Sequence, residues 1–214
     1  IGVRGGPGET AKEKELRHIE HLILKHKKDL KKLQSIRETQ RKYRIKNNVP
    51  HLCLIGYTNA GKSTLLNMLT KSNVLADDKL FATLDTTTRE LYIHGEKKGI
   101  ISDTVGFIQQ LPPRLIEAFK STLSELEHAD LLLHVIDLSD SDWQAHITVV
   151  SNILKDLKIN KEILYVFNKS DRINNNRISL SCSIAEYQPY VIISAQSKER
   201  SESLIEFLAD WKQK

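Results

Sequence analysis

One eight-residue stretch of this chain combines the residue types that bind a polyphosphate. It runs Gly56-Tyr57-Thr58-Asn59-Ala60-Gly61-Lys62-Ser63 and matches the pattern Gly-x4-Gly-Lys-Ser. In such a loop, backbone N–H groups and a helix N-terminus surround the phosphates, and Lys62 bridges the outer ones. The Ser63 hydroxyl is a ligand for Mg²⁺. The predicted nucleotide contacts here are Gly56, Tyr57, Thr58, Asn59, Ala60, Gly61, Lys62, Ser63 and Thr64.

A second stretch, Asp103-Thr104-Val105-Gly106, follows the next buried strand. A carboxylate at a strand end is placed to hold magnesium through water, and this predicts Asp103 as a metal ligand. Gly106 has no Cβ and can bring its N–H close to a terminal phosphate. Asp-x-x-Gly alone is weak evidence, but its order and distance after the phosphate loop make it strong.

A third group of residues predicts the choice of base. Asn168-Lys169-Ser170-Asp171 ends a predicted strand, and Asp171 can accept from N1–H and the exocyclic amine of guanine together. Adenine offers no such donor pair, so an adenine-nucleotide kinase or ATPase conflicts with Asp171. We expect Asn168 to meet the opposite base edge. The turn Ser194-Ala195-Gln196 after the last strand is expected to close on the base through backbone groups.

These motifs need a scaffold of alternating strands and helices. From His51 onward, short apolar segments of strand length alternate with segments of helix length. This alternation predicts a six-stranded, mostly parallel α/β sheet covered by helices on both faces, with one antiparallel edge strand next to Gly95. Ligands on such a sheet bind beyond the carboxyl ends of the strands. The predicted strands are Leu52–Ile55, Leu91–Ile93, Gly99–Ser102, Leu131–Ile136, Ile163–Phe167 and Tyr190–Ile193. The predicted helices are Ser63–Thr70, Leu115–Leu126, Trp143–Leu157 and Glu199–Trp211.

The chain before this domain divides into two further parts. Residues 1–9 form a Gly-rich linker, and residues 10–46 form a long basic amphipathic helix that starts at the capping pair Thr10 and Glu13. The nucleotide domain covers residues 47–214. Along the helix, a narrow coiled-coil seam needs a partner, which is either lost upstream, supplied by another molecule or replaced by the globular domain. The seam consists of Leu16, Ile19, Ile23, His26, Leu30 and Leu33. Because the chain opens at Ile1 rather than Met, we expect a fragment or a processed product.

Positive charge is concentrated in this helix. Residues 12–46 hold thirteen Lys and Arg against five Asp and Glu, whereas the chain from Asn47 onward has a balance of −3. The run is either a solvated helix face or an arm that follows a nucleic-acid backbone, and composition alone does not choose between them.

Composition narrows the class of protein. A chain of 214 residues with 40% hydrophobic and 28% charged residues fits one globular domain and excludes a disordered or collagen-like chain. The longest uncharged apolar stretch is far too short to span a membrane. Cys53 and Cys182 suggest neither a disulfide framework nor a zinc site. We therefore expect a soluble, cytoplasmic and monomeric protein.

The ordered motifs resemble those of the HflX family of ribosome-associated GTPases. The resemblance rests on the phosphate loop, on Leu80-Phe81-Ala82-Thr83-Leu84-Asp85, on Asp103-Thr104-Val105-Gly106-Phe107-Ile108 and on Gly8-Glu9-Thr10. It implies a P-loop GTPase (G) domain in which Thr83 joins Ser63 on magnesium and senses the γ-phosphate. The residues alone do not choose Thr83 over Thr86, Thr87 or Thr88. The further nucleotide contacts implied are Phe81, Ala82, Leu84 and Asp85.

The same resemblance implies a function and partners. The ligands would be GTP or GDP with Mg²⁺, and the partner would be the ribosome, mainly its large subunit and ribosomal RNA, in splitting or rescue under stress. Residues 10–46 would be the second of two paired helices of an upstream domain. Thr86 departs from the family because proline is usual there, and the helix start also departs from the family pattern. A nucleotide-stabilised RNA-binding module and a GTPase of ribosome assembly remain as alternatives.

Hydrolysis is expected to be slow. Lys62, Thr83 and Gly106 are the predicted catalytic residues, but Phe107 stands where many GTPases have a glutamine that orients water. Asn59 either binds a potassium ion that offsets phosphate charge or only shapes the turn. Phe107 and Ile108 either form a partner-binding patch or pack back onto the domain.

Overall fold

The computed structural model describes residues 11–70, 87–104, 106, 125–173 and 182–213. Its chain divides into two compact units, Ile1–Asn48 and Val49–Lys214. The sequence placed this boundary at residues 46 and 47. None of the described helices is long and apolar enough to cross a membrane.

The described part of the first unit is dominated by one helix. Helix α1, Ala11–Lys46, spans 36 residues without glycine or proline. Its ends match the helix dipole, with Glu13 in the first turn and Arg44 and Lys46 in the last. Asn48 adopts a left-handed φ of 48° just before Pro50, and the helix therefore stops. The predicted cap Thr10 lies outside the described residues, as does the predicted linker.

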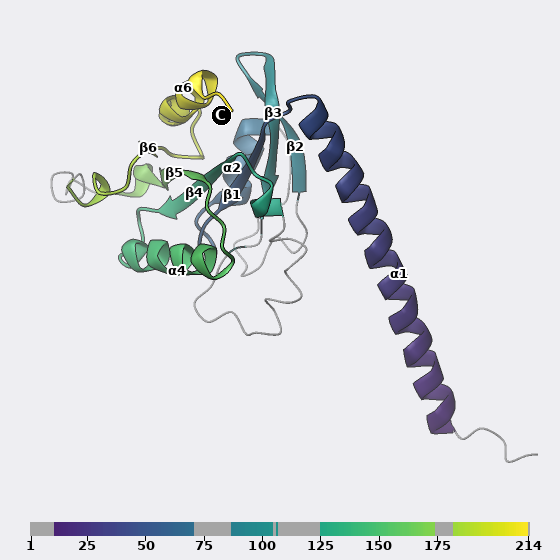
Figure 1. The fold of residues 1–214 in the computed structure, drawn as a ribbon. Coiled ribbons are helices and arrows are strands. Elements are labelled where there is room, and N and C mark those ends of the chain that lie inside the picture. Colours follow the sequence, from purple (N-terminus) through teal and green to yellow (C-terminus); the bar gives the residue numbers. More distant parts are fainter. Residues whose placement is uncertain (1–10, 71–86, 105, 107–124, 174–181, 214) are drawn as a thin grey trace, which may run out of the picture. The chain divides into compact units, whose positions relative to one another are not determined.

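The second unit is built on a six-stranded sheet of order β2-β3-β1-β4-β5-β6 (Figure 1). All neighbouring strands are parallel except β2 and β3, which form the antiparallel edge. The predicted fold class is thus confirmed. The strands are β1 His51–Ile55, β2 Thr87–Ile93, β3 Glu96–Asp103, β4 Leu131–Asp137, β5 Glu162–Asn168 and β6 Tyr190–Ile192.

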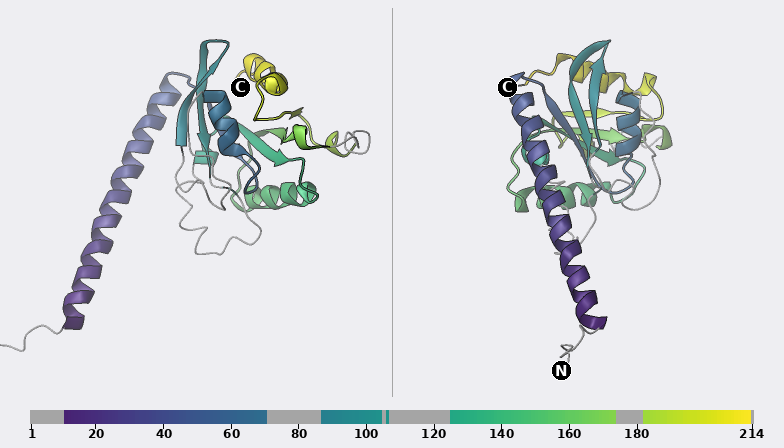
Figure 2. Two further views of the ribbon diagram at one scale, coloured as in Figure 1. Left: turned by 180° about the vertical axis from the view of Figure 1, so that it is seen from behind. Right: turned by 90° about the vertical axis from the view of Figure 1, so that its right-hand side faces the viewer.

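Helices pack on both faces of this sheet, which Figure 2 shows from two further directions. On β1, Leu52 and Leu54 face a core that also contains the buried leucines of α2 and α6. Cys53 and Ile55 point the other way, into a core with Val150 and Leu154 of α4. This alternation follows from the two-residue period of a strand. The helices are α2 Lys62–Thr70, α4 Trp143–Asp156 and α6 Glu202–Asp210, with short 3₁₀ turns at Ser170–Arg172 and Glu199–Ser201.

Three predicted elements have other bounds than expected. Strand β3 begins at Glu96 rather than Gly99, since its first residues pair with β2 across the turn at Gly95. Strand β2 begins at Thr87 rather than Leu91, because its first four residues pair with β3 through the backbone while their side chains lie exposed or half-exposed at the sheet edge. The predicted last helix is a 3₁₀ turn followed by α6, which ends before Trp211, where the backbone becomes extended. Residues 115–124 of the predicted helix Leu115–Leu126 lie outside the described residues.

Candidate nucleotide-binding site

The predicted phosphate loop connects β1 to α2, and its two glycines are required by the backbone. Gly56 has φ +147°, and a Cβ there would lie 2.2 Å from the carbonyl oxygen of Val135. Gly61 has φ +95°, and a Cβ there would lie 2.3 Å from Nδ2 of Asn168. The loop therefore curls against β4 and the end of β5 at a distance that only glycine permits.

Lys62 lies at the start of α2 with its side chain folded into this loop. It is only 6% exposed, and its Nζ donates to the carbonyl oxygens of Gly56 at 3.2 Å and Tyr57 at 2.9 Å. Burial lowers the pKa of Lys62 to about 8, although the nearby Asp103 carboxylate acts to raise it. A Cβ on Gly106 would lie 3.1 Å from Nζ of Lys62, and thus the Gly106 backbone reaches the same point.

The two predicted magnesium ligands that the structure describes lie in direct contact. Ser63 Oγ donates to Asp103 Oδ2 at 2.7 Å, and Asp103 is fully buried. They meet because β1 and β3 are parallel neighbours with Leu54 in register with Asp103. Thr104 Oγ1 donates to the carbonyl oxygen of Leu54 at 2.6 Å and so fixes the end of β3 beside the loop. A hydroxyl beside a carboxylate is a set of hard oxygen donors that fits Mg²⁺.

The predicted base-recognition residues follow β5 and β6. The Ser194 hydroxyl donates to Asp171 Oδ1 at 2.6 Å, and this hydrogen bond is the main reason that the pKa of Asp171 is lowered. Asp171 is exposed, whereas Ser194 and Ala195 are buried and Gln196 is exposed. The Asp171 carboxylate is therefore ionised and accessible to a base.

Asn168 joins the two halves of the site. Its Nδ2 donates to the carbonyl oxygen of Ala60 at 2.9 Å, and its Oδ1 accepts from the N–H of Ala195 at 2.9 Å. The side-chain amide thus holds the phosphate loop against the turn after β6. The contact with a base edge that the sequence predicts would use the second N–H of Nδ2.

Several predicted site residues lie outside the described part of the chain. They are Phe81, Ala82, Thr83, Leu84, Asp85, Val105, Phe107 and Ile108.

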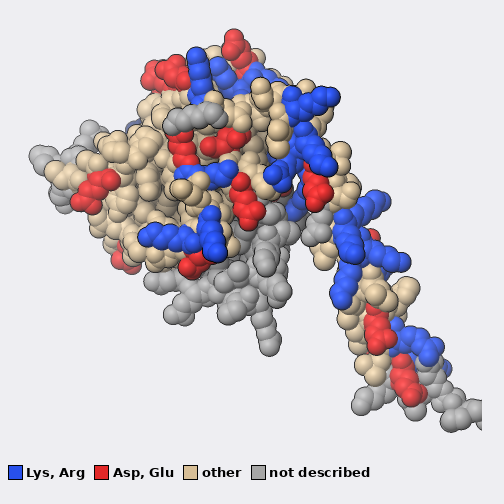
Figure 3. All heavy atoms as spheres, in the orientation of Figure 1, with Lys and Arg blue, Asp and Glu red and all other residues tan. Residues whose placement is uncertain are grey.

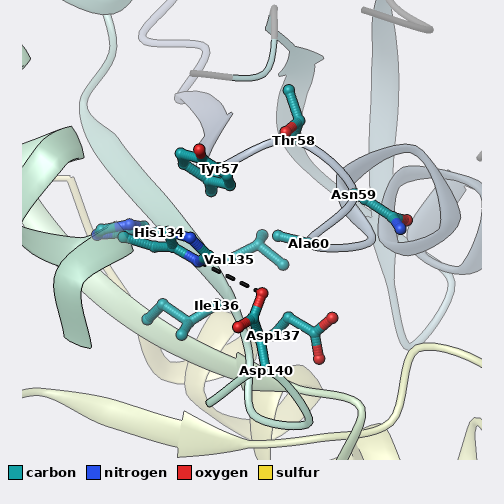
Figure 4. Close-up of a pocket in the computed structure, with 10 residues that line it drawn as sticks. Tyr57, Thr58, Asn59, Ala60, His134, Val135, Ile136, Asp137 and Asp140 are labelled. Atoms are coloured by element: carbon teal, nitrogen blue, oxygen red, sulfur yellow. Dashed lines mark ion pairs between the residues drawn. The ribbon is translucent and has the colours of Figure 1, made fainter. Parts of the chain in front are cut away.

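Sequence reasoning missed a hollow beneath the first half of the phosphate loop (Figure 4). The hollow lies between Tyr57, the carboxyl end of β4 and the start of α4. His134 lines it and is buried, and burial, with a smaller effect of Lys62, lowers the pKa of His134 to about 3. Asp137, the last residue of β4, accepts from Lys169 Nζ at 2.6 Å. Its position at a strand end, like that of Asp103, was the signal that could have revealed it.

Comparisons with known proteins agree with this geometry. The family described as "50S ribosome-binding GTPase" matches residues 51–169. The GTPase HflX of Magnetococcus marinus is 45% identical over 206 residues, which cover 96% of this chain. The chain belongs to the HflX family of GTPases. The HflX protein of Caldanaerobacter subterraneus is 49% identical over 83% of the chain. These matches cover 47% and 42% of the two relatives, and this HflX-family chain thus spans about half their length.

A solved structure extends the comparison beyond the family. The HflX-family chain is similar to Era in a complex with MgGDPNP and part of 16S ribosomal RNA, with a TM-score of 0.62 and 27% identity. The match covers 75% of this chain and 56% of Era. The fold of the second unit is therefore shared with a protein whose solved structure holds MgGDPNP.

Proposed function

We propose that this HflX-family chain binds GTP and GDP with Mg²⁺ and hydrolyses GTP slowly, as the switch of a larger protein that acts on the ribosome. The observation that carries the proposal is the contact of Ser63 with Asp103 beside a glycine-dependent phosphate loop. The carboxylate of Asp171, which can select guanine, follows β5. In the sheet, β5 lies two strands away from β1, the strand that precedes the phosphate loop.

Each group has a role in nucleotide binding. The loop amides and the α2 N-terminus bind the phosphates, and Lys62 neutralises the outer phosphate charge. Ser63, with Thr83, would hold magnesium directly, and Asp103 would hold it through water. The metal neutralises the oxygens on which charge develops during cleavage. Asp171 accepts the two guanine donors, and Lys169, two residues earlier in the chain, is held by an ion pair of its Nζ with Asp137.

Hydrolysis needs a positioned water, and Phe107 has no group that could orient one. Gly106 can donate its N–H to the γ-phosphate, and the proposed Asn59 potassium site would add positive charge. Asn59 lies at the left-handed turn of the loop, with φ 59°. We expect GTP turnover in KCl to exceed turnover in NaCl at equal ionic strength at least tenfold. Equal rates, or a KCl effect that survives Asn59→Ala, would contradict the potassium site.

The family and the charge distribution support a ribosomal partner. The matching family is described as binding the 50S particle, and the two relatives are named HflX GTPases. The first unit adds a basic helix whose residues 12–46 carry a net charge of +8. We place the action at the large subunit in the cytoplasm, in the splitting or rescue of ribosomes under stress.

Two experiments test the proposal. Competition titrations with GTP, GDP and ATP, with and without Mg²⁺, should show guanine binding that ATP does not displace. Phosphate release under single-turnover conditions should rise when large subunits are in excess, and Lys62→Ala should abolish nucleotide binding. If ATP competed equally, the assignment of Asp171 would fail.

A second candidate is a GTPase of ribosome assembly, and the similarity to RNA-bound Era favours it. Co-sedimentation of the longer protein with mature and with precursor subunits, both large and small, separates the two roles. A nucleotide-stabilised RNA-binding module would instead bind subunits without any stimulated phosphate release.

A further inference from the structure

The first half of the phosphate loop is supported by a side chain of α4, a helix that lies far from the loop in the sequence. The ring of Tyr57, the second residue of the loop, lies parallel to the ring of His146 on α4. The ring centroids are 3.8 Å apart and the planes differ by 7°. The loop overlies the hollow here, and the stack supports it from the side of α4.

His146 is itself held in place by the loop between β4 and α4. Its Nδ1 lies 3.6 Å from Asp140 Oδ2, and Asp140 Oδ1 accepts from the N–H of Asp142 at 2.9 Å. Both side chains are partly exposed, so this contact, which is an ion pair only when His146 is protonated, adds little free energy by itself. Its effect is to orient the imidazole ring under Tyr57.

The same loop is anchored at its other end to the base-recognition motif. Asp137 Oδ2 accepts from Lys169 Nζ at 2.6 Å, while Oδ1 accepts from the N–H and the hydroxyl of Ser139. Residues 137–142 therefore form a short bridge with Lys169 at one end and His146 at the other. Through the stack, the bridge reaches the phosphate loop.

We propose that His146, oriented by Asp140, is a positioning residue that holds Tyr57 and keeps the amides of the phosphate loop aimed at bound nucleotide. The inference rests on the proposed function, since it assumes that this loop binds guanine nucleotide. A loop that is ordered before binding loses less entropy on binding. Loss of the stack therefore speeds nucleotide dissociation without removing any group that touches the nucleotide.

The test is the dissociation rate of fluorescent GDP from the 214-residue chain, measured by stopped flow. His146→Ala should dissociate about two- to tenfold faster than wild type, because a stacked ring pair contributes on that scale. His146→Phe keeps a flat ring and should recover most of the wild-type rate. Asp140→Asn should fall between the two. Gln144→Ala, an exposed change on the same helix, is the matched control and should have no effect.

A double-mutant cycle shows whether His146 acts through Tyr57. The variant that combines Tyr57→Ala with His146→Ala should dissociate no faster than Tyr57→Ala alone. Independent, multiplying effects would overturn the proposal, as would a wild-type rate in His146→Ala. If His146→Ala does not fold, a His146→Phe rate within about twofold of wild type supports the stack, and a rate as fast as that of Tyr57→Ala rejects it. Failure of the wild-type chain to bind GDP would instead reject the proposed function.

Discussion

Lys62 is the residue at which burial and charge conflict most directly. Its ammonium is buried against two loop carbonyls, and burial lowers its pKa to about 8. Below pH 8 the group is already charged in the free protein, so nucleotide binding needs no proton. Above pH 8 the group is neutral, and polyphosphate binding must take up a proton to restore the charge.

GDP affinity should therefore be constant below pH 8 and fall as the pH rises through 8, by up to about tenfold per pH unit. Isothermal titration between pH 6.5 and 9 measures this. Lys62→Arg, which keeps its charge at every pH used, should bind more weakly but show a flatter profile and corrects for ionisation of the nucleotide. A wild-type profile as flat as that of Lys62→Arg would contradict the prediction.

The base preference should change with a single atom of Asp171. Asp171→Asn replaces one acceptor oxygen with a donor N–H₂, which then faces the exocyclic amine of guanine. We expect GDP affinity to fall about 10³-fold. Xanthine has a carbonyl oxygen in place of that amine, so affinity for xanthosine diphosphate should rise in the same variant. Competition titrations with both nucleotides measure the change.

The matched control for this switch is Asp156→Asn, an exposed carboxylate at the end of α4. It should leave both affinities unchanged. Retention of GDP binding by Asp171→Asn would show that another residue selects the base.

At the scale of elements, the loop between β1 and α2 depends on its close approach to β4. Gly56→Ala would place a Cβ 2.2 Å from a backbone oxygen of Val135 at a φ of +147°. We expect a loss of about 3 kcal/mol or more in unfolding free energy, since backbone strain and overpacking add. Urea denaturation of the nucleotide-free chain measures this.

Gly95→Ala is the matched comparison because it changes another positive-φ glycine. Gly95 lies in the β2–β3 turn with φ +84°, and a Cβ there would meet nothing within 4 Å. Only the conformational cost remains, about 1 kcal/mol. Equal losses in the two variants would mean that the contact with Val135 does not matter.

The elements that sequence predicted well are those whose environment is uniform along their length. Strands β1 and β4 are almost completely buried and are mainly apolar, as expected for central parallel strands, with buried His51 at the start of β1 and buried His134 inside β4. The start of β2 escaped prediction because Thr87 to Glu90 carry polar side chains at a sheet edge, where only backbone pairing defines the strand. The local pattern of polar and apolar residues does not show which backbone groups pair between strands.

In the candidate site, too, some contacts could be predicted from the sequence and others could not. Proximity of Ser63 and Asp103 was predictable because both follow parallel strands, whose ends meet at one edge of a sheet. The stack of Tyr57 on His146 was not, because it depends on how α4 lies on the sheet, and nothing local to either residue indicates a partner 89 positions away. The base contact of Asn168 stays a prediction, while its two hydrogen bonds within the protein could not be predicted because they depend on how the phosphate loop and the turn after β6 pack together.

At the scale of the whole molecule, the chain divides into a unit with its own core and a unit that is mainly one exposed helix. Helix α1 leaves large apolar side chains open to solvent, such as Leu24 at 59% and Leu30 at 54%. Lys and Arg side chains also recur along it (Figure 3). When the chain is cut between the units, we therefore expect the second unit alone to keep its affinity for nucleotide and to lose affinity for the ribosome.

Removal of residues 1–48 should leave GDP affinity within about twofold of the intact chain, because every described nucleotide-site residue and its supporting core lie in Val49–Lys214. Affinity for the large subunit should fall, and its dependence on salt should weaken, because each lost phosphate contact lowers the salt slope by about 0.7 to 0.9. Co-sedimentation with purified large subunits across a KCl series measures both.

Neutralising Lys27, Lys28, Lys31 and Lys32 to glutamine in the intact chain should reproduce much of the change in slope, whereas Lys155→Gln with Lys158→Gln, on the G domain, should not. An unchanged slope after the truncation would mean that the positive charge of α1 is only a solvated helix face.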